Sequence, residues 1–423
     1  MAKQQQYRVL ERIASGGMAE VFRAESAGLE GFKKKVAIKR VLPHLCEKKE
    51  FIGMFLDEAR LSAHLGHSNC VQVFDIGRGD DSFFIVMELV DGADLKGVME
   101  HRRKVGQAVP VAEACLICAK ICEGLAYAHE LVDEDGQSLH IVHRDMSPPN
   151  VLITRYGEVK IVDFGLAKAN SQLEESQPGI IKGKFGYLSP EAAQGQAVDQ
   201  RTDIFAVGII LWEMLAGQRL FQGKTDLEKV KKVQRAEVPD IRQLNPQVSD
   251  GVWSVMARAL AGDPNQRYQT ARALGEDLTQ VLFSQAQPVT SFDIARLVLD
   301  VQQARASEKQ ASQVPSSLIG SLIQEALLEF TSLGEGGDSN GPDSHSQGSV
   351  PLALGSFSSS AAPPVARDEM DWEDSLSWGT EAEAPPPSGL GDELELGNLS
   401  ALEDDAPETV APKENSAWWK WKK

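Results

Sequence analysis

The feature that most constrains this chain is a polar run between apolar segments, His143 to Asn150, followed after a short spacer by Asp163-Phe164-Gly165. Asp145 and Asn150 lie five positions apart. One side chain can therefore accept a hydroxyl proton while the other offers an oxygen to a hard cation. Asp163 supplies a second oxygen ligand beyond the spacer. This set of residues is suited to metal-assisted phosphoryl transfer.

The charge of the chain is divided unevenly along its length. Of the 423 residues, 42% are hydrophobic and 25% charged, as in ordinary soluble globular proteins. Residues 1–283 carry 35 basic and 38 acidic side chains, whereas residues 284–423 carry 8 and 23. The net charge of -18 therefore belongs mainly to the C-terminal part. A near-neutral folded part with an acidic tail argues against nucleic-acid binding as the main activity.

Neither a leader sequence nor a membrane span is expected. The N-terminus is polar and lacks the pattern of a signal peptide. The most apolar run, Ile204 to Gly217, is short and contains Glu213, so it predicts a buried helix and no transmembrane segment. Five cysteines without disulfide spacing suit a reducing compartment, and we expect a cytoplasmic protein. The spacing of Cys115, Cys118 and Cys122 favours one buried helix face over a metal site.

The spacing H-R-D-x-x-x-x-N followed by D-F-G resembles that of the protein kinases. Other motifs extend the resemblance over roughly residues 7–283, and the wording G-G-M-A-E-V resembles bacterial serine/threonine kinases. The resemblance implies an α+β, two-lobed fold with ATP and Mg²⁺ bound between the lobes. We expect a small antiparallel sheet lobe at 7–90 and a larger helical lobe at 91–283.

The resemblance also implies a nucleotide site in the small lobe. Its glycine-rich loop would be Ile13-Ala14-Ser15-Gly16-Gly17-Met18-Ala19-Glu20-Val21, in which alanines replace the family's first and third glycines. The two remaining glycines still let backbone N–H groups approach phosphate oxygens. Lys39 ends the strand Val36-Ala37-Ile38-Lys39 and would bind the α- and β-phosphates. Glu58, in a helical stretch from Phe51 to Leu65, would orient Lys39.

An adenine site follows from the same resemblance. Met87 would be the gatekeeper at the end of an apolar strand, and residues 88–90, with Glu88 and Leu89, would form the hinge. Hinge backbone groups would hydrogen-bond the adenine edge. The ring would lie between Val21, Ala37 and Leu152.

The catalytic and structural roles are also taken from the family. Asp145 would be the base, and Asn150 and Asp163 would hold the metal ions. Arg144 would bind a phosphate group carried by the activation segment. Three further residues have implied structural roles: the catalytic loop would be held by Asp203, and an ion pair would join Glu191 to Arg267.

Two departures from the family stand near the base. The family's lysine two residues after the aspartate is here Ser147, and its threonine ahead of the closing Gly-Tyr is here Lys184. The exchange predicts that Lys184, near the end of the activation segment, supplies the positive charge that the family's lysine would bring close to Asp145. An equal alternative is that Lys184 is a solvated loop lysine. The activation segment also lacks threonine, so its candidate phosphorylation sites are Ser171, Ser176, Tyr187 and Ser189.

Beyond residue 283 the resemblance ends. A helical extension is expected at 288–333, with apolar stripes at 291–306 and 317–330 that would pack on the large lobe or on a second copy in a homodimer. Residues 334–423 read as a disordered acidic tail, since 334–412 hold 17 acidic residues and one basic residue. Tryptophans at 371–378 and 418–423 suggest a protein partner for this tail.

The sequence therefore predicts a serine/threonine protein kinase that modifies protein substrates, and the resemblance places it in bacterial signalling. The choice of serine and threonine rests on the resemblance alone. Two alternatives remain open. The altered glycine loop and Ser147 would suit a pseudokinase-like scaffold that recruits partners through its tail, and a small-molecule kinase could share the fold. Glu191 and Asp203 favour a protein substrate.

Overall fold

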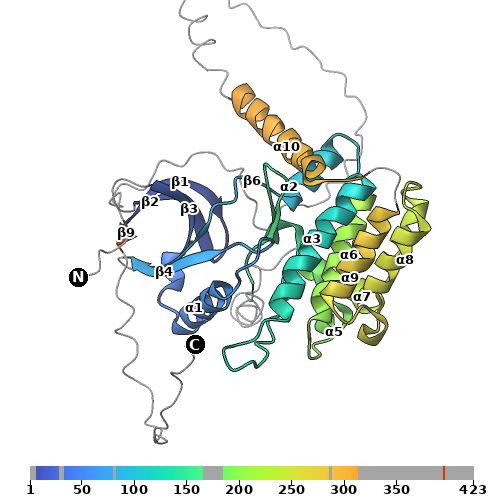
Figure 1. Ribbon diagram of the computed structural model, residues 1–423, viewed down its shortest axis with the longest axis horizontal. Coiled ribbons are helices and arrows are strands. Elements are labelled where there is room, and N and C mark those ends of the chain that lie inside the picture. Colours follow the sequence, from blue (N-terminus) through green and yellow to red (C-terminus); the bar gives the residue numbers. More distant parts are fainter. Residues whose placement is uncertain are drawn as a thin grey trace, which may run out of the picture. The chain divides into compact units, whose positions relative to one another are not determined.

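The computed structural model describes residues 6–27, 33–79, 82–164, 184–284, 288–312 and 394–395. Within these ranges a small antiparallel sheet lobe stands beside a larger helical lobe (Figure 1), as the sequence predicts. No helix in the described ranges has the length and apolar character needed to cross a membrane.

The small lobe is built on an antiparallel sheet and one helix. Its elements are β1 (Gln6–Ser15), β2 (Ala19–Ala27), β3 (Lys33–Val41), η2 (Pro43–Leu45), α1 (Lys49–Ala63), β4 (Val73–Gly79) and β5 (Ser82–Glu88). The strand order is β4-β5-β3-β2-β1, and the two-residue β9 (Leu394–Glu395) pairs with the outer edge of β1. The predicted glycine turn joins β1 to β2, where the Gly16 N–H donates to the Ala19 carbonyl at 2.9 Å.

The large lobe is mainly helical. Its elements are β6 (Gly92–Asp94), α2 (Leu95–Lys104), α3 (Val111–His129), η3 (Pro148–Asn150), β7 (Val151–Thr154), β8 (Val159–Ile161), η4 (Lys184–Tyr187), α5 (Pro190–Ala193), α6 (Arg201–Ala216), α7 (Asp226–Gln234), η5 (Ile241–Gln243), α8 (Asp250–Ala259), η6 (Pro264–Gln266), α9 (Ala271–Phe283) and α10 (Ser291–Ser312). Strands β6, β7 and β8 form a separate small sheet.

Helix α6 forms the centre of the large lobe. Every residue from Thr202 to Leu215 is buried, which is why the sequence there is apolar on all sides. Gly217 ends the helix with φ 65°, a left-handed conformation that suits glycine. Helix α3 packs beside α6, and the predicted cysteine face of α3 is wholly buried.

The first half of α10 belongs to the same hydrophobic core. Ile294, Leu297, Val298 and Val301 are buried there, together with residues of α2, α3 and α6. The turn between β7 and β8 allows α10 to approach closely, because Gly157 has φ 82° and a Cβ atom on it would lie 1.8 Å from the Ser291 carbonyl oxygen. The predicted stripe at 317–330 and nearly all of the predicted acidic tail lie outside the described residues.

Burial of α10 predicts a stability difference between two of its side chains. Ile294 is 1% exposed, so Ile294→Ala should lower the free energy of unfolding by about 2–5 kcal/mol through lost burial and a cavity. The control, Leu299→Ala, alters a side chain that is 44% exposed and should stay within about 0.5 kcal/mol of wild type. Urea denaturation measures both, and equal values would show that α10 does not pack on the lobe in solution.

Candidate active site

A buried lysine connects the two lobes at the candidate site. Lys39 on β3 donates to Glu58 of α1 at 3.0 Å and to Asp163, which follows β8, at 2.9 Å. These three residues come from three separate segments. The structure pairs Lys39 with Glu58 as the sequence predicts, and it adds a contact between Lys39 and Asp163 that the sequence does not predict. An ammonium group has three N–H bonds, so these two contacts leave one for a further anion.

The charges in this cluster shift one another. Burial by itself lowers the pKa of Lys39, but the Asp163 and Glu58 carboxylates outweigh burial and hold the pKa above its usual value. Lys39 is therefore charged at neutral pH. Burial raises the pKa of Glu58 to about 7, and the nearby carboxylates of Asp163 and Asp145 add to this against the opposing effect of Lys39. Lys39 thus forms ion pairs with both Glu58 and Asp163.

The catalytic loop is held by Asp203 near the start of α6. Its carboxylate accepts the backbone N–H of His143 and of Arg144, each at 2.8 Å. The ring of His129, at the end of α3, lies 2.8 Å from the same carboxylate. Burial alone raises the pKa of Asp203, but His129, His143 and the Arg144 N–H together hold it below the usual range. The carboxylate stays charged although it is only 1% exposed.

His143 packs the loop against the segment that carries Asp163. Its ring lies 4.7 Å from the ring of Phe164, and Nε2 is 3.0 Å from the Val162 carbonyl oxygen. Arg144 and Asp163 both adopt left-handed backbone conformations, with φ 65° and 66°. Such conformations cost about 1–3 kcal/mol in residues other than glycine and recur at functional sites. The hydrogen bonds of Asp203 offset that strain on the loop.

Asn150 is fixed relative to Asp145. Its Nδ2 donates to the Asp145 carbonyl oxygen at 2.7 Å and lies 3.3 Å from Asp145 Oδ2. The amide is thereby oriented, and its Oδ1 is the atom that remains as a metal ligand. Ser147 is buried in the same loop, and its carbonyl accepts the Asn150 N–H at 3.0 Å. The side chain of Lys184 and the whole of Gly165 lie outside the described residues.

An apolar cradle adjoins the charged cluster. Its buried members come from both lobes and include five residues predicted to enclose adenine or to flank it: Ala14, Val21, Ala37, Met87 and Leu152. Ile13 and Leu89 pack against this cluster from its edge. The cradle therefore provides two apolar walls for a flat ring, with the hinge 88–90 beside it.

Two residues of the predicted glycine loop have other partners. The Glu20 carboxylate accepts hydrogen bonds from Arg12 and Arg40, each at 2.9 Å. Met18 packs against the apolar cluster formed by α1 and β3. Their side chains support the loop from outside the cradle. The side chain of Glu88 at the hinge likewise pairs with Lys160 at 3.0 Å.

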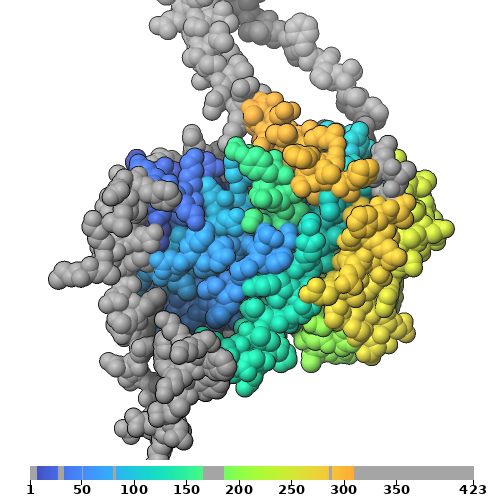
Figure 2. Space-filling view, viewed as in Figure 1, coloured from blue at the N-terminus to red at the C-terminus, as the bar shows by residue number. Residues whose placement is uncertain are grey.

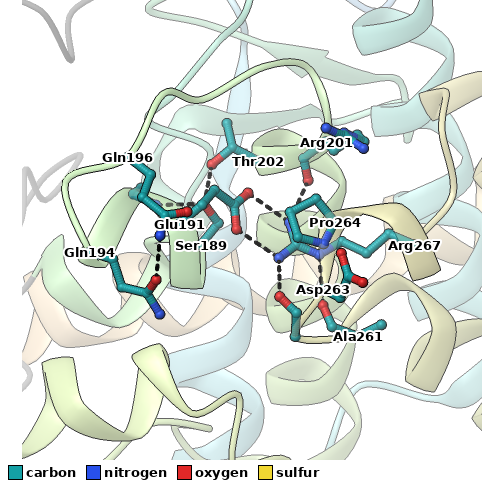
Figure 3. Close-up of polar contacts among 12 residues, drawn as sticks. Ser189, Glu191, Gln194, Gln196, Arg201, Thr202, Ala261, Asp263, Pro264 and Arg267 are labelled. Atoms are coloured by element: carbon teal, nitrogen blue, oxygen red, sulfur yellow. Dashed lines mark hydrogen bonds and ion pairs between the residues drawn. The ribbon is translucent and has the colours of Figure 1, made fainter.

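The predicted pair Glu191–Arg267 lies deep in the large lobe (Figure 3). Arg267 donates to the two carboxylate oxygens at 2.8 and 2.7 Å. Its remaining N–H groups reach three backbone carbonyls, those of Ala261, Arg201 and Gly262. All five guanidinium donors are therefore used. Burial alone raises the pKa of Glu191, but Arg267 holds it below its ordinary value.

Two candidate phosphorylation sites have their hydroxyl groups engaged. Ser189 is fully buried, caps α5 and accepts a hydrogen bond from Thr202 at 2.7 Å. The Tyr187 hydroxyl donates to Glu213 at 2.7 Å and also contacts Arg219. Both hydroxyls thus have structural roles in this conformation. Ser171 and Ser176 lie outside the described residues.

Sequence reasoning missed two partners in this network. The helical spacing of α3 indicates only that His129 shares the buried face of the cysteines, although its contact with Asp203 makes it a positioning residue for the catalytic loop. Glu213 was treated only as a charge within an apolar helix, although it accepts from Tyr187 and from the Leu220 N–H. A buried ionisable residue in an apolar run is a signal that could have indicated a partner.

Comparison with known proteins agrees with this geometry. The family model described as "Protein kinase domain" matches residues 7–278. The chain belongs to the protein kinase family. It is 39% identical over 276 residues to "Tyrosine-protein kinase MasK" of Myxococcus xanthus, which covers 65% of this chain and 43% of that protein. It is 36% identical over 291 residues to "Serine/threonine-protein kinase PrkC" of Bacillus subtilis, covering 69% of this chain and 41% of the relative.

The likeness is confined to part of each relative, because the chain spans about two fifths of the length of these curated proteins. The solved kinase domain of Mycobacterium tuberculosis PknI matches 65% of this chain and 95% of its own, at 26% identity and a TM-score of 0.48.

Membership of the family implies ATP and a divalent metal ion, and the residues present fit both. Among the described residues no cluster of three or more His, Cys, Asp or Glu side chains could hold a metal alone. Asp163 and Asn150 instead offer a small set of oxygen ligands. Mg²⁺ is commonly held in this way, by one or two protein oxygens together with substrate phosphates. The third N–H of Lys39 and the apolar cradle suit the rest of the nucleotide.

The buried pair gives a contrast with an exposed one. Arg267→Leu leaves the Glu191 carboxylate without its partner in the interior and should lower the free energy of unfolding by about 3–5 kcal/mol. Arg272→Leu breaks a similar two-bonded pair with Glu130 whose side chains are 58% and 47% exposed, and it should shift the melting temperature little.

The same pair predicts a pH dependence. Because the pKa of Glu191 is lower in the folded chain than its ordinary 4.5, its contribution to stability is present above pH 4.5 and is lost as the pH falls through the folded value. Arg267→Leu should therefore be less damaging at low pH. Thermal melts across the pH range measure this, and a difference from wild type that is independent of pH would contradict it.

Proposed function

We propose that this chain transfers the γ-phosphate of ATP to serine or threonine hydroxyls of protein substrates. The observation that carries the proposal is the buried cluster of Lys39, Glu58 and Asp163 next to Asp145 and Asn150. A scaffold that transfers nothing has no need of a buried, charged lysine that pairs with one buried and one half-buried carboxyl group. Family membership supports the same reading.

Each residue of the site has a proposed role. Lys39 binds the α- and β-phosphates and Glu58 orients Lys39, so the phosphates of the nucleotide are held in one position. Asp145 accepts the proton of the attacking hydroxyl. Asn150 and Asp163 hold the metal ions, which when bound supply positive charge to the phosphate oxygens. Asp203 and His129 keep the loop in the conformation that these roles require.

The acceptor hydroxyl needs a test of its own, because the relatives named above include a tyrosine kinase as well as a serine/threonine kinase. Phosphoamino-acid analysis of the autophosphorylated chain decides between them. We expect phosphoserine and phosphothreonine. Phosphotyrosine as the sole product would overturn the choice of acceptor while keeping the transfer reaction.

Other proposals concern the C-terminal part of the chain. A protein partner for the tail, and a homodimer formed through the stripe at 317–330, fall on residues outside the described ranges and stay predictions.

Because Val298 and Val301 belong to the large-lobe core, the catalytic unit should be produced with α10 included.

Loss of one carboxylate tests the site directly. Asp163→Asn and Asp145→Asn should each keep the fold and lower the phosphotransfer rate, the second by about a hundredfold or more. Asp57→Asn on the exposed face of α1 is the matched control and should keep wild-type activity. Transfer to the chain itself and to a generic basic protein is the measurement. Wild-type rates in both site variants would leave the cluster without a catalytic role.

A further proposal concerns Lys184, which we place beside the transferring phosphoryl group as a substitute for the family's lysine at position 147. Lys184→Thr should then remove a transition-state contact of about 3 kcal/mol, or roughly a hundredfold in rate. Adding Ser147→Lys should restore much of it. Lys182→Thr is the matched control. A double variant no faster than Lys184→Thr would show that the charge does not come from this segment.

A further inference from the structure

Helices α3 and α9 of the large lobe pack side by side (Figures 1 and 2). A second depression lies between them. It is a groove of about 680 Å³ whose floor and walls include Ala126, Leu131, Val132 and Phe283. None of the residues placed in the candidate active site lines it. The proposed nucleotide and metal sites therefore do not account for this groove.

Large apolar side chains at this groove face the solvent. Phe283 at the end of α9 is 86% exposed, and Val132 just after α3 is 52% exposed. Exposed aromatic and aliphatic side chains along an open groove are a feature of surfaces that bind another segment. The size of the groove lies in the range of pockets that enclose side chains or small ligands.

The rim of the groove is acidic. Glu123, Glu130 and Glu276 line it, and among the residues that the structure describes Arg272 is the one lining arginine and no lysine lines it. Glu130 is paired with Arg272, and Glu123 with a lysine outside the groove. Glu276 is exposed and forms no ion pair with another described residue. A complementary ligand would carry apolar, preferably aromatic, groups and positive charge.

We propose that residues 418–423 of this chain, Trp-Trp-Lys-Trp-Lys-Lys, dock in the groove. This segment has three tryptophans to cover the apolar floor and three lysines to face the acidic rim. Tryptophan buries a large apolar area and keeps one N–H for a polar partner, which suits a groove of mixed character. The lysine stems can lie along the apolar wall while their ammonium groups reach the rim.

Other segments of the chain fit the groove less well. The apolar stripe at 317–330 carries Glu325 and Glu329 and no basic residue, so its charge has the same sign as the rim. The tryptophans at 371–378 lie in a segment with three acidic residues and no basic residue, and have the same disadvantage. Reach is no obstacle, because the 105 residues between Ser312 and Trp418 could span on the order of 350 Å when extended. Attachment in one chain also raises the effective concentration of the segment to the millimolar range for short linkers, and less for long ones.

A photo-cross-linker at position 283 of the full chain tests the docking. Phe283→p-benzoylphenylalanine changes one exposed aromatic residue for another, so the fold should be kept. The matched control is Phe292→p-benzoylphenylalanine, at a residue that is 80% exposed on α10 and does not line the groove. Cross-linked peptides are identified by mass spectrometry from equal mixtures of ¹⁴N- and ¹⁵N-labelled chains, which separates contacts within a chain from contacts between copies.

We expect position 283, and not position 292, to cross-link to residues 418–421 of the same chain. Adding Glu276→Lys should reduce the yield about fivefold, because an attraction at the rim becomes a repulsion, whereas Glu47→Lys on the small lobe should leave it unchanged. Cross-links to 317–330, cross-links only between copies, equal yields at 283 and 292, or no response to Glu276→Lys would each overturn the proposal.

Discussion

The site depends on one buried carboxylate. Asp203 receives two successive backbone N–H groups of the catalytic loop and lies against the ring of His129. An unpaired buried charge would be costly, so its partners are effectively obligatory. They hold Arg144 in its left-handed conformation and thereby set the direction of the loop from which Asp145 and Asn150 project. Without that anchor, the spacing of those residues would not place them together.

Linear motifs were the most predictable part of this molecule. Asp145 and Asn150 are close in sequence, and their chemistry follows from residue type and spacing. Lys39 and Glu58 lie 19 positions apart, so their pairing required the family pattern as well. His129 and Asp203 are 74 positions apart, and the periodicity of α3 reports only that His129 is buried. Partners joined by tertiary packing leave no signature in either local sequence.

The extension shows a related limit. The apolar spacing at 291–306 correctly indicated a helix, but a stripe of this kind says only that one face is covered. Two answers were open, the large lobe and a second copy. In the structure Ile294 and Val298 enter the core of the large lobe, so the covering surface is the chain's own. The choice rests on the shape of that surface, which includes the turn between β7 and β8 where Gly157 meets Ser291.

Gly157 shows how closely the extension is fitted to the lobe. Its left-handed conformation favours glycine, and the Ser291 carbonyl oxygen occupies the place of a Cβ atom. Any side chain there would push α10 away from the turn between β7 and β8. Position 157 therefore serves as a sequence marker within the family: a homologue with another residue at this turn must carry its extension along a different path, whatever the apolar pattern of that extension suggests.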